Sequence, residues 1–162
     1  SGMIAALLPA ATVLMTPFIG VFVDRIGKSA TVMIYGSAIL LIVHLTFALT
    51  HFPPYILMVL LGVAFSLVPA AMWPSMVKLV KEKQIGTAYG LMYSIQNLGL
   101  WGFPILAGMI LDATNPGNPE TLDYTYTILM FAGLGFLGLF FGYMLKRSDK
   151  KYDLGVDKPL NR

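Results

Sequence analysis

The chain has 162 residues, of which 57% are hydrophobic and 12% are charged, and its mean hydropathy is +0.74. A soluble domain carries about 25% charged residues, so this composition excludes an ordinary globular protein and predicts a polytopic membrane protein. The absence of cysteine excludes a disulfide framework and a thiolate metal site. The chain begins at Ser1 with no charged segment before the apolar residues, so we predict no signal peptide and expect a longer protein around it.

Five stretches without Asp, Glu, Lys or Arg are long enough to cross a bilayer, which takes about 20 apolar residues. Backbone groups inside a bilayer must pair within their own segment, so each stretch is predicted to be a helix and the fold class all-α. Prolines at positions 9 and 17 are expected to kink the first span or end its first segment. The predicted spans are residues 3–23, 30–49, 55–77, 85–111 and 124–145, which form one transmembrane bundle at 1–147 before a polar, mobile tail at 148–162.

The positions of the basic residues predict how the spans are oriented. All 11 Lys and Arg residues fall in the first loop, the third loop and the tail. In a five-span chain these regions lie on one side of the membrane, and the positive-inside rule makes that side cytoplasmic. We therefore expect the N-terminus outside and the C-terminus inside. The fourth loop, with strong turn chemistry at residues 115–120, is expected outside.

The first loop has the most specific pattern in the chain, G-x-x-x-D-R-x-G-K at residues 20–28. Gly20 permits close helix approach at the membrane edge, and Gly27 supplies the backbone freedom that a tight turn needs. Asp24 can cap a facing helix or pair with basic groups. Arg25 and Lys28 hold the loop in the cytoplasm. A generic positive-inside hairpin would explain Arg25 and Lys28 but neither Asp24 nor the glycines.

The ends of the first and fourth spans share a weak internal repeat. Residues 17–24 have the pattern P-x-x-G-x-x-x-D, and residues 104–112 have the pattern P-x-x-x-G-x-x-x-D. One end is predicted inside and the other outside, which is the arrangement of inverted-topology repeats in secondary transporters.

The first loop resembles the loop signature of the major facilitator superfamily. Members have twelve helices in two pseudo-symmetric halves, each built from two inverted three-helix repeats, with the signature between the second and third helices of a half. The resemblance covers residues 1–147 and implies the second half of such a transporter without its first helix. Ser29 departs from the pattern, because members often have a second basic residue there. The runs at residues 7–17 and 86–97 resemble a branch that includes lysosomal and bacterial carriers of dipeptides or small solutes.

Polar and aromatic side chains recur on one face of the fourth span, at Tyr89, Tyr93, Asn97 and Trp101. Gln96 lies beside Asn97, and such an amide pair deep in a span is costly unless it faces protein or water. These groups are candidates for hydrogen-bonding a solute near the middle of the membrane. The alternative is that they hold neighbouring helices together.

The third span supplies two further candidates for solute binding, Ser66 and Trp73. Pro69 and Pro74 predict a bend in this helix, which suits a helix that lines a cavity or a gate. The alternative is an ordinary kinked core helix.

Small residues recur at helix-contact spacing in the last two spans. One stripe comprises Gly86, Gly90 and Ser94, and the other comprises Gly135, Gly138 and Gly142. Such stripes let helix backbones approach closely in lipid, so both predict close helix neighbours.

His44 is the only ionisable side chain well inside a span, which makes it a candidate for proton coupling. The alternative is a neutral imidazole bonded to a neighbouring helix. We predict no catalytic residues, because Ser37 and His44 share one helix and no nucleophile elbow is present. We also predict no metal ligand cluster, no phosphate-binding loop and no cofactor. The basic tail either contacts anionic lipid or only sets the topology.

The loop pattern, the alternating charges and the repeat favour a fragment of a secondary active or facilitative transporter that moves a small solute by alternating access. The expected partners are the solute, the lipid bilayer and the missing N-terminal half of the same transporter, with no nucleic acid. The alternative is a complete five-span scaffold protein of the membrane without transport activity. Neither interpretation is an enzyme.

Overall fold

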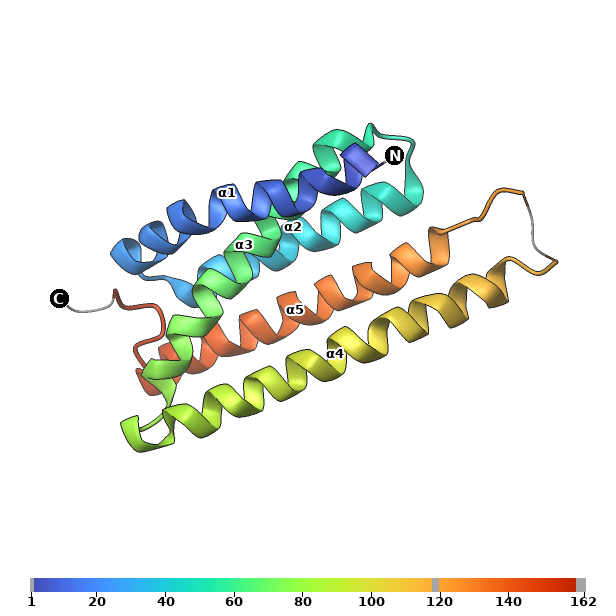
Figure 1. Cartoon of the computed structure of the whole chain (residues 1–162). Helices are drawn as coiled ribbons and strands as arrows, with labels where there is room; N and C mark the ends of the chain where they lie inside the picture. The colour runs from blue at the N-terminus through green and yellow to red at the C-terminus, as the bar shows by residue number, and fades with distance from the viewer. Residues whose placement is uncertain (1, 118–119, 160–162) are drawn as a thin grey trace.

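The computed structural model describes residues 2–117 and 120–159, so residues 118–119 of the predicted turn and 160–162 of the predicted tail lie outside the described residues. The described residues contain no strand, and every long helix is long and apolar enough to cross a membrane, which confirms the prediction of an all-α bundle with five spans. The helices are α1 (Gly2–Ile26), α2 (Ser29–Leu49), α3 (Pro54–Leu79), the short 3₁₀-helix η1 (Glu82–Gln84), α4 (Ile85–Thr114) and α5 (Thr125–Tyr152) (Figure 1).

The helices are longer than the apolar runs that predict them. α1 continues through Pro9 and Pro17, so the first span has no early end. α5 continues to Tyr152, past the predicted end at residue 145. Lys and Arg are good helix formers, and basic side chains in the last turn interact favourably with the helix dipole, so the charged sequence prolongs α5 beyond the apolar run.

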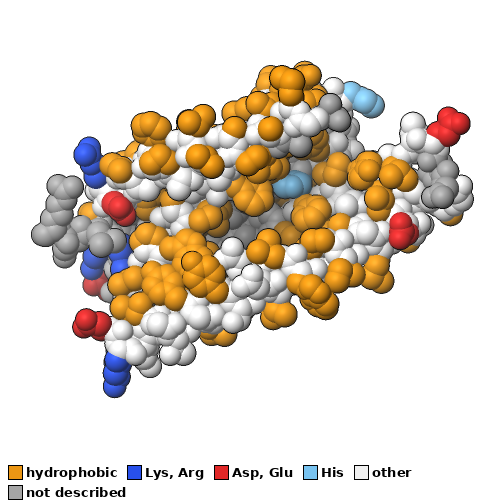
Figure 2. Space-filling view, viewed as in Figure 1, with side chains coloured by type: hydrophobic (Ala, Val, Ile, Leu, Met, Phe, Trp, Pro, Cys, Tyr) orange, Lys and Arg blue, Asp and Glu red, His pale blue; other side chains and the backbone are white. Residues whose placement is uncertain are grey.

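Successive helices run in alternating directions, so the α1–α2 turn, the α3–α4 connection and the C-terminal segment gather at one end of the bundle (Figure 1). We call this end the basic end, because the Lys and Arg side chains on the visible face all lie there (Figure 2). The α2–α3 and α4–α5 connections lie at the opposite end. The G-x-x-x-D sequences of α1 and α4 therefore lie at opposite ends, as an inverted repeat requires.

α1, α2 and α3 enclose two small apolar cores. One core lies toward the basic end and consists of Val23, Val32, Met33 and Ala71. The other lies toward the opposite end and consists of Val43, Leu57 and Leu61. Elsewhere many large apolar side chains are exposed, as a surface that faces lipid allows.

The glycine stripe of α5 packs directly against α2, as its spacing predicts. A Cβ added at Gly135 would lie 2.9 Å from the backbone nitrogen of Leu41, and one added at Gly142 would lie 3.0 Å from Cγ1 of Ile34. Both distances are shorter than ordinary van der Waals contact. At Gly135 the neighbour is backbone, so this separation of the two helices requires glycine there, whereas at Gly142 the side chain of Ile34 would have to shift.

α4 packs lightly on the rest of the bundle. None of its residues is buried in the described part of the chain, and Trp101 is 70% exposed. Its small-residue stripe has no close neighbour, because a Cβ added at Gly86 or Gly90 would meet nothing within 4 Å. The close contact predicted for this stripe is thus absent among the described residues.

Candidate functional site

The G-x-x-x-D-R-x-G-K motif at residues 20–28 ends in a two-residue turn between α1 and α2. The backbone N–H of Gly27 donates to the carbonyl oxygen of Val23 at 2.8 Å, which closes the last turn of α1. Gly27 has a φ of 70° and Lys28 a φ of 56°, so both lie in the left-handed region. Glycine adopts this conformation without a steric cost, which is the freedom expected of Gly27.

Gly20, Asp24 and Arg25 contribute no ion pair, side-chain hydrogen bond or close Cβ contact to the described bundle. Asp24 and Arg25 lie in the last turn of α1 with exposed side chains, and no ion pair joins either to a described residue. A Cβ added at Gly20 would meet nothing within 4 Å. Their roles in capping, pairing and close helix approach therefore stay predictions.

The tail folds back onto this turn. We call residues 153–159 the C-terminal strap. The backbone N–H of Lys28 donates to the carbonyl oxygen of Asp157 at 2.9 Å. A Cβ added at Gly27 would lie 2.6 Å from the backbone nitrogen of Pro159. The prediction of a mobile tail is wrong for these residues, because backbone contacts with the α1–α2 turn hold them in place.

Asp157 of the strap caps the start of α2. Its carboxylate accepts hydrogen bonds from the backbone N–H of Ala30 at 2.8 Å and from Oγ1 of Thr31 at 3.2 Å. Lys28, at the N-cap position, provides no side-chain cap of its own. A carboxylate here satisfies an otherwise unpaired N–H and interacts favourably with the positive end of the helix dipole.

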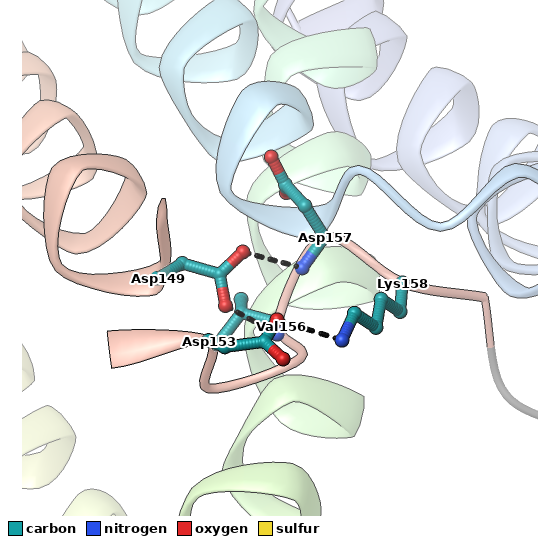
Figure 3. Close-up of polar contacts among 5 residues, drawn as sticks. All are labelled: Asp149, Asp153, Val156, Asp157 and Lys158. Atoms are coloured by element: carbon teal, nitrogen blue, oxygen red, sulfur yellow. Dashed lines mark hydrogen bonds and ion pairs between the residues drawn. The ribbon is translucent and has the colours of Figure 1, made fainter. Parts of the chain in front are cut away.

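Asp149, near the end of α5, holds the bend of the strap (Figure 3). Its carboxylate accepts the backbone N–H groups of Val156 at 2.7 Å and Asp157 at 3.1 Å. The side chain of Val156 is fully buried. The strap thus connects the end of α5 to the start of α2.

Two lysines complete the contacts of the strap. Lys78 at the end of α3 donates to the carbonyl oxygen of Val156 at 3.2 Å and to that of Lys158. The ammonium of Lys158 donates to Oδ1 of Asp153 at 2.7 Å (Figure 3). This hydrogen bond and the negative charge of Asp153 raise the pKa of Lys158. Three helices are therefore joined at the basic end by a segment that sequence reasoning did not single out.

Three of the predicted solute-binding residues meet where α3 approaches α4. The indole of Trp73 stacks on the ring of Tyr89, with centroids 5.5 Å apart, and lies 4.6 Å from the ring of Tyr93. The hydroxyl of Tyr89 donates to the carbonyl oxygen of Trp73 at 3.0 Å. This aromatic cluster ties α4 to α3 near the basic end.

The amide pair lies further along the same helix. α3 and α4 diverge from the basic end (Figure 1), and Gln96 and Asn97 are exposed beyond the aromatic cluster. Neither amide has a side-chain hydrogen bond to another described residue. Residue 97 lies roughly 18 Å along the axis from the start of α4, at a rise of about 1.5 Å per residue. That distance corresponds to the middle region of a membrane span.

Ser66 lies apart from these groups. It is 2% exposed, and its hydroxyl is within hydrogen-bonding distance of the carbonyl oxygens of Thr12, at 3.1 Å, and Gly62, at 3.0 Å. An added Cβ at Gly62 would lie 2.5 Å from Cβ of Ala11, so α1 and α3 are in close contact here. In the described chain Ser66 contributes to this helix contact.

His44 bonds within its own helix. Its Nδ1 lies 2.7 Å from the carbonyl oxygen of Leu40, and its ring lies 5.9 Å from that of Phe131 on α5. Since a carbonyl oxygen only accepts, Nδ1 carries the proton of this hydrogen bond. The bond lies within α2 and not with the neighbouring helix of the structural alternative, so the role of His44 stays a prediction. No group of His, Asp or Glu that could hold a metal ion occurs within 2–117 and 120–159.

Comparison with known proteins agrees with the loop pattern. The model of the Major Facilitator Superfamily matches residues 1–159. The chain is 48% identical over 99 residues to the Lysosomal dipeptide transporter MFSD1 of Mus musculus, a match that covers 61% of this chain and 21% of the mouse protein. The proteins of the same name from Gallus gallus and Homo sapiens are 48% identical over 98 residues and 46% identical over 99 residues, covering 60% and 61% of this chain and 22% and 21% of theirs.

The chain therefore spans about a fifth of the length of the curated relatives that it matches. The family match, in contrast, extends over almost the whole chain. Five membrane-length helices, the G-x-x-x-D-R-x-G-K turn and this match lead to one conclusion: the chain belongs to the Major Facilitator Superfamily.

Proposed function

We propose that this chain is part of a carrier that moves a small peptide-like solute, of the dipeptide class, across a membrane by alternating access. Its family membership supports a transporter, and the relatives named above support the solute class. In carriers built from repeats the solute site lies near the middle of the bilayer, at the interface between repeats.

The polar and aromatic stripe of α4 is the observation that carries this proposal. A zwitterionic dipeptide presents an ammonium, a carboxylate and an amide. The side-chain amides of Gln96 and Asn97 donate and accept hydrogen bonds, and both are exposed. The exposed ring of Tyr93 can attract an ammonium group, and Trp73 packs against this ring and holds it. A charged solute inside a membrane needs such partners, since lipid offers none.

We further propose that other helices of the carrier cover this face of α4. The exposure of α4 and the match to only a fifth of each relative support an arrangement with a second half. Asp24 then pairs across the bundle with that half and biases the carrier between inward-facing and outward-facing states. A bias of a few kcal/mol suffices for such a switch.

In the complete carrier reconstituted into vesicles, Asn97→Ala is expected to raise the half-saturating dipeptide concentration about tenfold, because a hydrogen bond to a charged group is lost.

Asp24→Asn is expected to lower the maximal rate while solute binding stays nearly unchanged, because the variant alters the balance of states and not the site. Initial rates of radiolabelled dipeptide uptake measure both quantities.

Ser94→Ala is the matched control, because the Ser94 hydroxyl already bonds to the carbonyl oxygen of Gly90 in its own helix, at 2.9 Å. If Asn97→Ala and Ser94→Ala behave alike, α4 does not supply the solute site. If no dipeptide is taken up by the unaltered carrier, the proposed solute class is wrong.

The orientation of the chain can be tested separately. We propose that the basic end is cytoplasmic, because all loops with Lys or Arg lie there. The chain has no cysteine, so single cysteines at Lys81 and Thr121 report each end without background. In vesicles of known orientation, a membrane-impermeant maleimide should label Thr121→Cys from the outer side and Lys81→Cys only from the cytoplasmic side. Labelling of both from the same side would refute the five-span topology.

A further inference from the structure

A groove of about 440 Å³ lies on α5 where the apolar run meets the basic end. Phe140, Tyr143 and Met144 line its apolar part, and Arg147, Ser148 and Lys151 line its polar part. Residues 140 and 151 are roughly 16 Å apart along the helix axis, at about 1.5 Å per residue. The groove therefore extends over the depth from a lipid headgroup to the middle of an acyl chain.

The groove lies on the side of α5 that faces away from α2. Gly142 is buried against α2. Successive residues turn by roughly 100° around a helix, so Phe140, Met144 and Lys151 lie on the face opposite Gly142. These three side chains are exposed. Only residues of α5 line the groove in the described part of the chain.

The basic residues of the groove have no acidic partner in the described chain. The three carboxylates near the end of α5 are occupied: Asp149 accepts backbone N–H groups of the strap, Asp157 caps α2, and Asp153 pairs with Lys158. No carboxylate lies within 4.0 Å of Arg147 or Lys151 in the described part of the chain. The ammonium of Lys151 instead lies 4.9 Å from the ring centre of Tyr152. The basic part of the groove therefore lies next to an apolar surface and has no acidic partner among the described residues.

We propose that this groove binds an anionic phospholipid in the leaflet at the basic end. Arg147 and Lys151 bind the phosphate, Ser148 donates a further hydrogen bond, and an acyl chain lies along Phe140 and Met144. Guanidinium groups bind phosphate oxygens through two parallel hydrogen bonds, and aromatic side chains favour the membrane interface. An acidic peptide would satisfy the charges but would leave the apolar part of the groove without a partner.

The test measures retention of phosphatidylglycerol and of phosphatidylcholine by native mass spectrometry of the carrier in detergent. We expect Arg147→Gln combined with Lys151→Gln to lower the affinity for phosphatidylglycerol about 25-fold and that for phosphatidylcholine much less, since each basic residue at a membrane surface contributes roughly fivefold. Lys146→Gln combined with Lys150→Gln is the matched control. It removes the same charge with the same spacing from the same helix, and neither residue lines the groove.

Equal losses in the two double variants would overturn the proposal, because the basic end would then attract anionic membranes without a defined site. Inorganic phosphate and glycerophosphoglycerol test the source of the anion. If either competes as strongly as the intact lipid, the groove is a phosphate site and not a lipid site. Phe140→Ala combined with Met144→Ala should weaken the intact lipid and leave glycerophosphoglycerol unchanged, and an unchanged lipid affinity would exclude the acyl contact. Thermal unfolding confirms that each variant is folded.

Discussion

Gly135→Ala is expected to destabilise the bundle by about 1–3 kcal/mol, which is the usual cost of overpacking a tight contact. The new methyl group would lie 2.9 Å from the backbone nitrogen of Leu41 and 3.0 Å from its Cα. A backbone atom cannot rotate away as a flexible side chain can, so α2 and α5 must separate. Thermal unfolding in detergent should show a midpoint lowered by roughly 3–10 °C.

Gly133→Ala provides the control from the same helix. Gly133 is exposed, and a Cβ there would meet nothing within 4 Å. The control should be neutral or slightly stabilising, because alanine is the better helix former by about 1 kcal/mol. If both variants unfold at the same temperature, the glycine stripe does not hold α5 against α2.

Asp157→Ala is expected to release the C-terminal strap and to cost about 0.5–2 kcal/mol, the range for loss of an N-cap. The backbone N–H of Ala30 and the hydroxyl of Thr31 lose their acceptor, and the start of α2 loses a favourable charge. Hydrogen exchange followed by mass spectrometry should show faster exchange of the amides in 153–159 and in the first turn of α2.

The control for Asp157 is Asp153→Asn, which removes a carboxylate charge from the same segment and keeps a residue type that tolerates the positive φ of 48° at this position. Asp153 pairs with Lys158 at the surface, with side chains 81% and 65% exposed, and such pairs contribute little. A second pair of variants tests the contact between the strap and the α1–α2 turn. Gly27→Ala and Gly117→Ala both place alanine at a positive φ, but only the Cβ at Gly27 would collide with the strap. If Asp157→Ala and Gly27→Ala exchange the amides of 153–159 no faster than their controls do, the strap is not held by these contacts.

Several features of this protein could be predicted because they depend on neighbouring residues in the chain. Apolar runs of membrane length specify the five helices, since backbone groups in lipid must pair within each run. The glycine stripe of α5 follows from residue spacing alone, and its contact with α2 is observed. The turn at Gly27 follows from the need for a positive φ between two closely spaced helices.

Other features depend on how distant segments meet, and spacing along the chain carries no information about that. The stripe at Gly86 and Gly90 has the same spacing as the stripe in α5, yet no described helix packs on it. The sequence makes both Ser66 and Asn97 candidates for solute binding, but the α1–α3 crossing buries Ser66 whereas the divergence of α3 and α4 leaves Asn97 exposed.

The strap is the largest departure from expectation. Its polar composition predicted mobility, because polar chain ends rarely bury enough apolar surface to become ordered. Asp157 is nevertheless ordered by the N-terminus of α2, 127 residues earlier in the chain. Helix dipoles and unpaired N–H groups attract a carboxylate wherever the fold brings one close. Only the convergence of α2, α3 and α5 at the basic end places Asp157 within hydrogen-bonding distance.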